Sequence, residues 1–131
     1  MMRVGFLPSD FNPMILMLGE AEDCRALGGV LRRFARDQQD VALSSLGFCD
    51  VQGADVLLTA AEGAPGVQQC EGFAFIWRVP IEMAAGFAER LDDLADPGRI
   101  AGSEDLACGT GDGIAVKVSR GEYTDDFLGS G

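Results

Sequence analysis

Two segments of the chain repeat their hydrophobic residues at the three- and four-residue spacing of an amphipathic helix. In residues 20–36, the repeated positions are Cys24, Leu27, Leu31 and Phe34, with Val30 and Ala35 beside them. In residues 80–96, they are Ala84, Phe87, Ala88, Leu91 and Leu94. Pro80 suits a first helical turn, and Asp96-Pro97-Gly98 ends the second pattern. The spacing therefore predicts two helices, each with one face in the core.

The first helical segment also carries charges that match a helix dipole. Acidic residues lie near its start and arginines lie near its end. Gly28-Gly29 falls in its middle, where each glycine costs about 1 kcal/mol relative to alanine. We expect packing to compensate, through close approach of the helix backbone to a sheet.

Short apolar or alternating segments predict the strands. They are residues 3–7, 14–19, 41–46, 55–61, 73–79 and 114–118. A turn-rich connection joins the first two in a hairpin, and the next two form an antiparallel pair. The aromatic segment 73–79 is expected to lie centrally, whereas residues 62–72 and 99–113 have the composition of loops.

The resulting order is strand, strand, helix, three strands, helix, strand, with no internal repeat in the sequence. Consecutive strands without intervening helices predict an α+β fold, because a doubly wound nucleotide-binding fold needs regular alternation. We expect a single two-layer domain over residues 1–123. It would have a mainly antiparallel sheet of about five or six strands, with both helices on one face. Residues 124–131 are expected to form a flexible tail.

The absence of histidine restricts the chemistry of this 131-residue, 13.8 kDa chain. Ser-His-Asp and Cys-His catalysis, imidazole proton shuttles and most catalytic zinc sites lose their central group. General acid or base catalysis would fall to Asp or Glu, to Tyr123, to Lys117 or to a cysteine.

The charge balance is strongly acidic. Ten basic residues stand against 21 acidic ones, which gives a formal net charge of −11. The negative electrostatic field of such a chain repels phosphate backbones and anionic lipids, so we expect neither a nucleic-acid nor a membrane partner. A basic protein or a metal cation fits it better, and solubility alone is an equally good explanation.

Cysteine spacing and segment composition predict a cytoplasmic protein. Cys24, Cys49, Cys70 and Cys108 form no C-x-x-C pair, and reduced thiols are expected. The N-terminal residues lack the apolar stretch of a signal peptide, and the longest apolar run, at residues 14–18, is far shorter than the roughly 20 residues of a membrane-spanning helix.

Nine arginines against one lysine, with many alanines and glycines, are typical of a bacterial genome.

Three kinds of candidate site are weighed against simpler interpretations. The glycine-rich segment 108–113 leads into a strand rather than a helix, which favours a turn over a phosphate site. Cys108 has no histidine to activate it, so a packed thiol is favoured over a nucleophile. Carboxylate clusters occur at residues 89–96 and 122–126 without a calcium-loop pattern, which favours solvated faces. We therefore predict neither a metal nor a cofactor.

The charged faces of the two helices supply the candidate partner-binding residues. They are Arg25, Arg32, Arg33 and Arg36 on the first helix and Glu89, Asp92 and Asp93 on the second. The arginines can dock an acidic partner or balance the chain's own carboxylates, and internal balance is preferred because exposed ion pairs are common and weak. The aromatic residues lack the surrounding cations of a nucleic-acid stacking platform, which favours core packing.

Two classes of function remain. The first is a non-catalytic protein-binding module that engages a basic partner. In size, charge and element order the chain resembles the small acidic α+β immunity proteins of bacterial toxin systems, which bind and block a cognate toxin. That resemblance rests on no motif, so it assigns no residues. The second class is a small oligomeric enzyme or ligand-binding protein that uses carboxylates, Tyr123 or Cys108 without histidine. An open sheet edge allows a homodimer in either class.

Overall fold

The computed structural model describes residues 2–7, 14–52, 55–61, 65–69, 74–98, 102–106 and 114–120. In these residues the chain forms two helices, α1 (Ala21–Asp37) and α2 (Ile81–Leu94), and the short 3₁₀ helix η1 (Leu43–Ser45). The strands are β1 (Met2–Leu7), β2 (Met14–Leu18), β3 (Val41–Ala42), β4 (Cys49–Gln52), β5 (Val56–Ala60), β6 (Gly66–Gln69), β7 (Phe75–Val79), β8 (Gly102–Asp105) and β9 (Ala115–Arg120). The predicted α+β class is confirmed.

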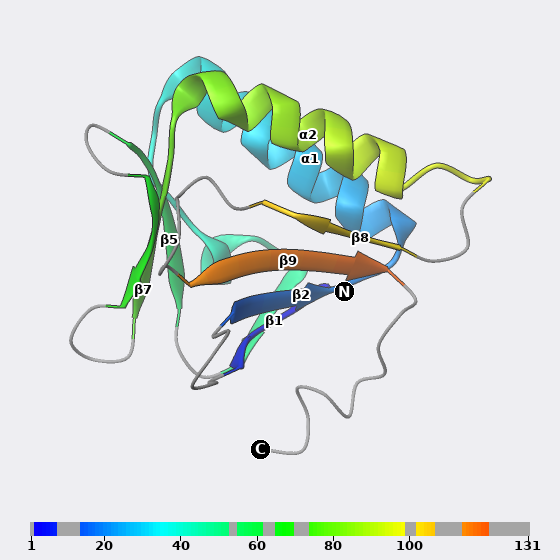
Figure 1. Ribbon diagram of the computed structural model, residues 1–131, viewed down its shortest axis with the longest axis horizontal. Helices are drawn as coiled ribbons and strands as arrows, with labels where there is room; N and C mark the ends of the chain where they lie inside the picture. Colours follow the sequence, from blue (N-terminus) through cyan, green and yellow to red (C-terminus); the bar gives the residue numbers. More distant parts are fainter. Residues whose placement is uncertain are drawn as a thin grey trace.

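The strands form two mixed sheets. The five-stranded sheet has the order β4-β1-β2-β9-β8, and the four-stranded sheet has the order β3-β5-β7-β6. A single bridge between Val67 and Ile114 links them. Figure 1 shows α1 and α2 side by side along one side of the molecule, with the larger sheet beneath them and the smaller sheet at one end. The described strands therefore differ from the predicted single sheet in number and in sheet count.

The strands that the sequence analysis missed are short and polar. β6 reads Gly-Val-Gln-Gln and β8 reads Gly-Ser-Glu-Asp, compositions typical of loops. The strand expected over residues 41–46 is only β3, followed by the 3₁₀ turn of η1, and the unpredicted β4 comes after that turn. Backbone hydrogen bonds to longer neighbouring strands hold these segments extended. Their side chains therefore show little of the hydrophobic pattern from which a strand is predicted.

The helical faces pack as the periodicity predicts. The buried positions are Cys24, Leu27, Val30, Leu31 and Phe34 in α1 and Ala84, Phe87, Ala88, Leu91 and Leu94 in α2. They share one core with Phe75 and Trp77 of β7, which lies between β5 and β6. Burial of Asp23 is offset at the start of α1, where its Oδ2 accepts a hydrogen bond from the backbone N–H of Glu20 at 2.9 Å.

Gly28 lies where α1 packs closely against α2. A Cβ atom built there would lie 3.4 Å from the carbonyl oxygen of Ala88 and 3.4 Å from Oδ1 of Asp92. Nothing lies within 4 Å of the corresponding atom at Gly29. The close approach that we expected toward a sheet is instead made toward α2.

The strand registers contain a repeat that is not evident in the sequence. β1 and β2 form an antiparallel hairpin that pairs Val4 with Met17, and β6 and β7 form one that pairs Val67 with Trp77. β2 leads into α1 and β7 leads into α2, each four residues after Met17 or Trp77. The element order ββαββ thus occurs twice, as β1, β2, α1, β3, β5 and as β6, β7, α2, β8, β9, with β4 as an addition.

The two halves exchange strands. β9 runs parallel to β2 and pairs Val118 with Met17, whereas β5 runs parallel to β7 and pairs Leu58 with Trp77. Each of these strands carries its own antiparallel edge strand, β8 on β9 and β3 on β5. β2 corresponds to β7, α1 to α2 and β5 to β9. In each of these pairs, a residue of the first element matches the residue sixty positions later in the second. Each sheet is therefore completed by two strands from the other half.

Candidate functional site

The charged residues of α1 and α2 lie on adjacent helices, and two of the candidate partner-binding residues pair with each other. Nη2 of Arg32 donates to Oδ2 of Asp92, an ion pair between the helices. That hydrogen bond raises the pKa of the Arg32 guanidinium above its ordinary value. The pair joins matching positions of the two halves, which lie sixty residues apart in α1 and α2.

Two further candidate arginines also contact their own chain. Nη2 of Arg25 donates to the backbone carbonyl of Ala95 at 3.1 Å, and Nε of Arg36 donates to Oδ1 of Asp37 at 2.9 Å. The hydrogen bond from Arg36 lowers the pKa of the Asp37 carboxyl. Internal charge balance thus accounts for the observed contacts of Arg32 and Arg36, whereas Arg25 contacts a backbone carbonyl.

Arg120 is a charged residue whose role the sequence reasoning missed. Its Nη1 donates to the carbonyls of Leu94 at 2.8 Å and Asp96 at 3.0 Å, at the end of α2. The last turn of α2 has no basic residue of its own. Arg120 from β9 and Arg25 from α1 therefore supply the positive charge that a helix C-terminus favours. Sheet pairing brings Arg120 to this helix end and helix packing brings Arg25 there, so no local signal reveals the contacts.

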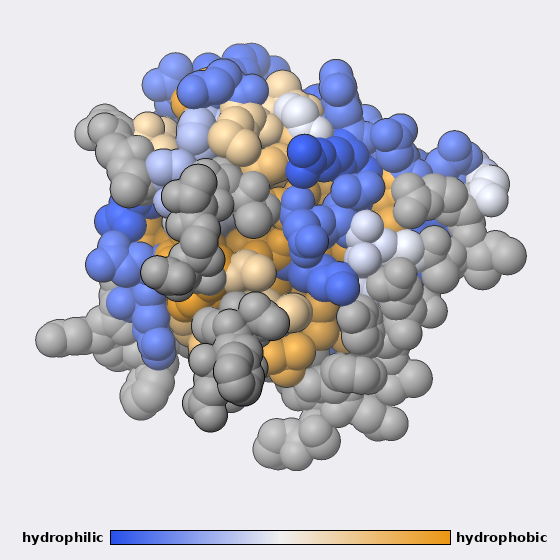
Figure 2. Space-filling view, in the orientation of Figure 1, coloured by the Kyte–Doolittle hydropathy of each residue, from blue (hydrophilic) through white to orange (hydrophobic). Residues whose placement is uncertain are grey.

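Three candidate residues are exposed and have no side-chain hydrogen bond or ion pair in the described part of the chain. They are Arg33, Glu89 and Asp93. Figure 2 shows hydrophilic residues along the edge that carries the helices and at both sides of the molecule, around a hydrophobic area at the centre of this face. These exposed charges are the part of the predicted set that a partner can reach without breaking an observed contact.

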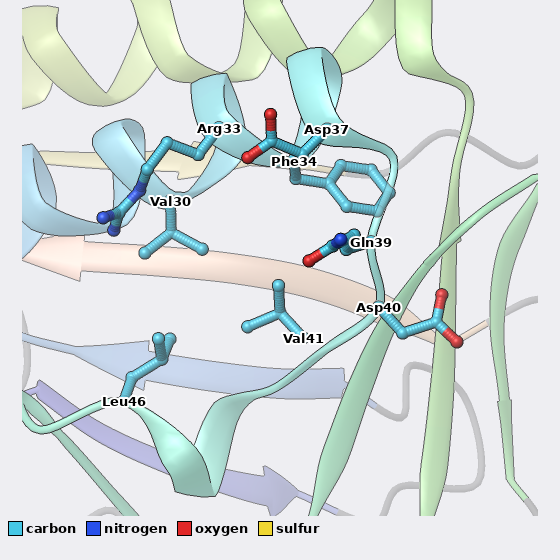
Figure 3. A pocket seen from close by; sticks show the side chains of 8 residues that line it. All are labelled: Val30, Arg33, Phe34, Asp37, Gln39, Asp40, Val41 and Leu46. Carbon is cyan, nitrogen blue, oxygen red and sulfur yellow. The ribbon is translucent and has the colours of Figure 1, made fainter.

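A small pocket lies between α1 and β3. Its volume is about 180 Å³, and its apolar lining residues are Val30, Phe34, Val41 and Leu46. Its polar lining residues are Arg33, Asp37, Gln39 and Asp40. In Figure 3 the guanidinium of Arg33 and the carboxylate of Asp40 lie at opposite ends. Drug-sized ligands and cofactors occupy pockets of roughly 300–1,000 Å³, so this one suits a single side chain.

Both described cysteines are poor nucleophiles. Burial, with a contribution from the Asp23 carboxylate, raises the pKa of the Cys24 thiol to about 11 and that of the Cys49 thiol to about 11. Because the thiolate is the reactive form, both side chains stay protonated and unreactive near neutral pH. Both are free thiols, as the spacing predicts. Cys70 and Cys108 lie outside the described residues, as does the glycine-rich segment 108–113.

No group of three or more Cys, Asp or Glu side chains converges as a metal site in the described ranges. Glu89, Asp93 and Asp96 of the predicted cluster are exposed. The second carboxylate cluster, the expected tail at residues 124–131 and Tyr123 fall outside the described ranges. The aromatic residues Phe34, Phe75, Trp77 and Phe87 are buried in the core, as predicted, and Phe73 is not described.

The helices are short of a membrane span. In the described part of the chain, neither α1 nor α2 combines the length and the apolar character needed to cross a bilayer.

Comparisons with protein-family models, with curated proteins and with solved structures find no match to this chain.

Proposed function

We propose that the chain is a non-catalytic protein-binding module that engages a basic partner through its acidic surface. The observation that supports this most directly is the position of its carboxylates. Glu89, Asp93 and Asp96 are exposed on α2 or just after it, and Asp37 and Asp40 are exposed at the end of α1. Carboxylates arranged on a surface attract and orient a cationic protein, whereas catalytic carboxylates converge in a partly buried cleft.

The pocket and the cysteines of the described residues give little support to catalysis. The pocket of about 180 Å³ is small for a substrate with a cofactor. The Cys24 and Cys49 thiols are held protonated, and the chain has no histidine. These features favour binding over the enzyme alternative that the composition leaves open.

The finer form of this proposal is an immunity-like role in the bacterial cytoplasm, with a cognate toxin as the basic partner. Homodimer formation through an open sheet edge belongs to the same proposal. Light scattering of the purified protein distinguishes a mass near 13.8 kDa from twice that value.

Affinity capture from an extract of the native host tests the proposal. The tagged protein is used at low and at high salt, and the retained proteins are identified by mass spectrometry. A single basic protein that is retained only at low salt is expected, because salt screens attraction between exposed charges. The purified partner is then titrated against the wild type and against a Glu89→Lys/Asp93→Lys variant.

Glu89→Lys alone is compared with Asp105→Lys, a control with the same change of charge, because Asp105 is exposed on the edge strand β8 and not on the helix pair. Binding that is lost in the helix variant and kept in the control places the interface on α2. Retention of no protein other than the chain itself, at any salt concentration, would contradict the proposed function.

A further inference from the structure

The repeat allows the pocket to be compared with its counterpart in the second half of the chain. The pocket lies between α1 and the edge strand β3, and the counterpart region lies between α2 and the edge strand β8. The registers match Val41 of β3 with Glu104 of β8, because Val41 pairs with Leu58 and Glu104 pairs with Val118. The helices match from their first residues, Ala21 and Ile81, so Val30 corresponds to Arg90.

In the second half, Arg90 crosses from the helix to the edge strand. Its Nη1 donates to the backbone carbonyl of Asp105 at 3.1 Å, and its guanidinium carbon lies 5.7 Å from the centre of the Phe87 ring. That side chain combines an apolar stem, a hydrogen bond and a cation–π contact in one place. At the corresponding position of the first half, Val30 is too short to cross, and the pocket remains open.

Two more arginines gather at the end of α2 and have small counterparts at the end of α1. Arg120 donates to the carbonyls of Leu94 and Asp96, and its matching position is Ala60. Arg25 donates to the carbonyl of Ala95, and its matching position is Ala85. The contacts that Arg25, Arg90 and Arg120 make around α2 therefore have no counterpart around α1, where the arginine that lines the pocket is Arg33.

The open pocket has the chemistry that a guanidinium side chain needs. Val30, Phe34, Val41 and Leu46 offer an apolar surface for its methylene groups. Asp40 is exposed and uses Oδ1 to accept a hydrogen bond from the Thr59 hydroxyl at 2.7 Å, which leaves lone pairs for a second donor. The negative end of the α1 dipole adds to the attraction, whereas the Asp37 carboxylate is already paired with Arg36.

We propose that the pocket between α1 and β3 is the docking site for an arginine side chain of the basic partner. This inference rests on the proposed function and names the part of the surface that recognises one residue of that partner. The partner's arginine would occupy the place that Arg90 occupies in the second half. Arg33, at the opposite end of the pocket from Asp40, opposes it through its like charge.

The probe is a capped Gly-Arg-Gly peptide, titrated into the ¹⁵N-labelled full chain and followed by backbone amide shifts. Saturable shifts are expected at Gln39, Asp40 and Val41, around the pocket. The matched peptide carries citrulline in place of arginine, which keeps the shape and removes the charge. It is expected to cause no saturable shift at these amides, because the charge-assisted hydrogen bond to a carboxylate is lost.

Three variants refine the test. Asp40→Asn removes one charge beside the ligand and should weaken arginine-peptide binding by about twofold to fivefold. Arg33→Glu changes the charge by two units and should strengthen binding by at least that factor. Val30→Arg fills the pocket from α1 as Arg90 does from α2, and should abolish the shifts. Asp105→Asn, the same charge change on the edge of the other sheet, should leave the affinity unchanged.

Equal binding of the arginine and citrulline peptides would overturn the inference. So would shifts scattered over the acidic surface that Asp40→Asn and Arg33→Glu leave unaltered, because these indicate general charge attraction only. The arginine pocket can be refuted without refuting the proposed function. A captured partner that binds Asp40→Asn and Val30→Arg as tightly as the wild type refutes the arginine pocket and leaves the binding function standing.

Discussion

Single glycines in α1 have opposite structural roles. We expect Gly29→Ala to raise the free energy of unfolding by about 0.5–1 kcal/mol, because alanine is the better helix former and its Cβ meets nothing within 4 Å. Gly28→Val should instead lower it, because the branched side chain extends beyond a Cβ that already lies 3.4 Å from the Ala88 carbonyl oxygen. Urea unfolding of the two variants measures both effects.

Gly86→Ala in α2 is the control, since nothing lies within 4 Å of its added Cβ and the same small gain is expected. Equal stabilities of Gly28→Val and wild type would show that the helices do not approach as closely as described.

The two described thiols make the folded state sensitive to alkali. Their pKa values rise to about 11 in the folded chain from an ordinary 9.0, so the unfolded chain loses these protons first as the pH rises. The free energy of unfolding should therefore fall between pH 9 and pH 11, and this decrease should shrink in a Cys24→Ala/Cys49→Ala variant measured against its own value at pH 8.

Thiol labelling at pH 8 gives an independent measurement. A pKa two units higher leaves about 100-fold less thiolate, so Cys24 and Cys49 should react far more slowly with iodoacetamide than a free thiol does. Rapid labelling of either residue in the folded protein would contradict the burial that raises its pKa.

At the scale of elements, the end of α2 depends on a side chain from another part of the chain. Arg120→Ala should lower the free energy of unfolding by about 1–3 kcal/mol, because two helix-end carbonyls lose a charged hydrogen-bond donor. Arg120→Lys retains the charge but not the guanidinium fork, and an intermediate loss is expected. Denaturant unfolding of the three proteins tests this order, and a loss confined to the lysine variant would contradict it.

Elements with strong internal periodicity were predictable, and elements defined by their neighbours were not. Leu27, Leu31 and Phe34 identify a helix face because each turn repeats the same requirement for burial. β8 has one buried residue, Gly102, among its four, so its extended form follows from pairing with β9 rather than from its side chains. The extended form of β6 likewise follows from pairing with β7. Because β6 and β8 were not predicted, we expected one sheet instead of two.

The candidate site was predictable only in part, for a related reason. Periodicity places Arg33, Glu89 and Asp93 on exposed helix faces, and the structure agrees. The ion pair of Arg32 with Asp92 and the pocket beside Val41 depend on how α1 meets α2 and β3. Contacts between segments far apart in sequence carry no local pattern.

For the whole molecule, strand exchange predicts that neither half folds alone. A chain cut between Ala61 and Pro65 separates β1–β5 from β6–β9. The first fragment then lacks two strands of each sheet, and the second lacks three strands of the larger sheet and two of the smaller. Separately purified fragments should be largely unfolded by circular dichroism, and mixing them should restore the native spectrum. A well-folded isolated fragment would show that its sheets do not need the exchanged strands.

The exchange also sets an order of events during synthesis on the ribosome. The smaller sheet has all of its strands once Val79 has emerged, but β2 meets its parallel neighbour only when Ala115 to Ser119 are made. Until then, the nascent chain exposes an apolar strand edge at Met14–Leu18, a surface that invites pairing with other chains. We therefore expect rapid translation past β9, or a chaperone bound to the edge of β2, to limit aggregation of the nascent chain.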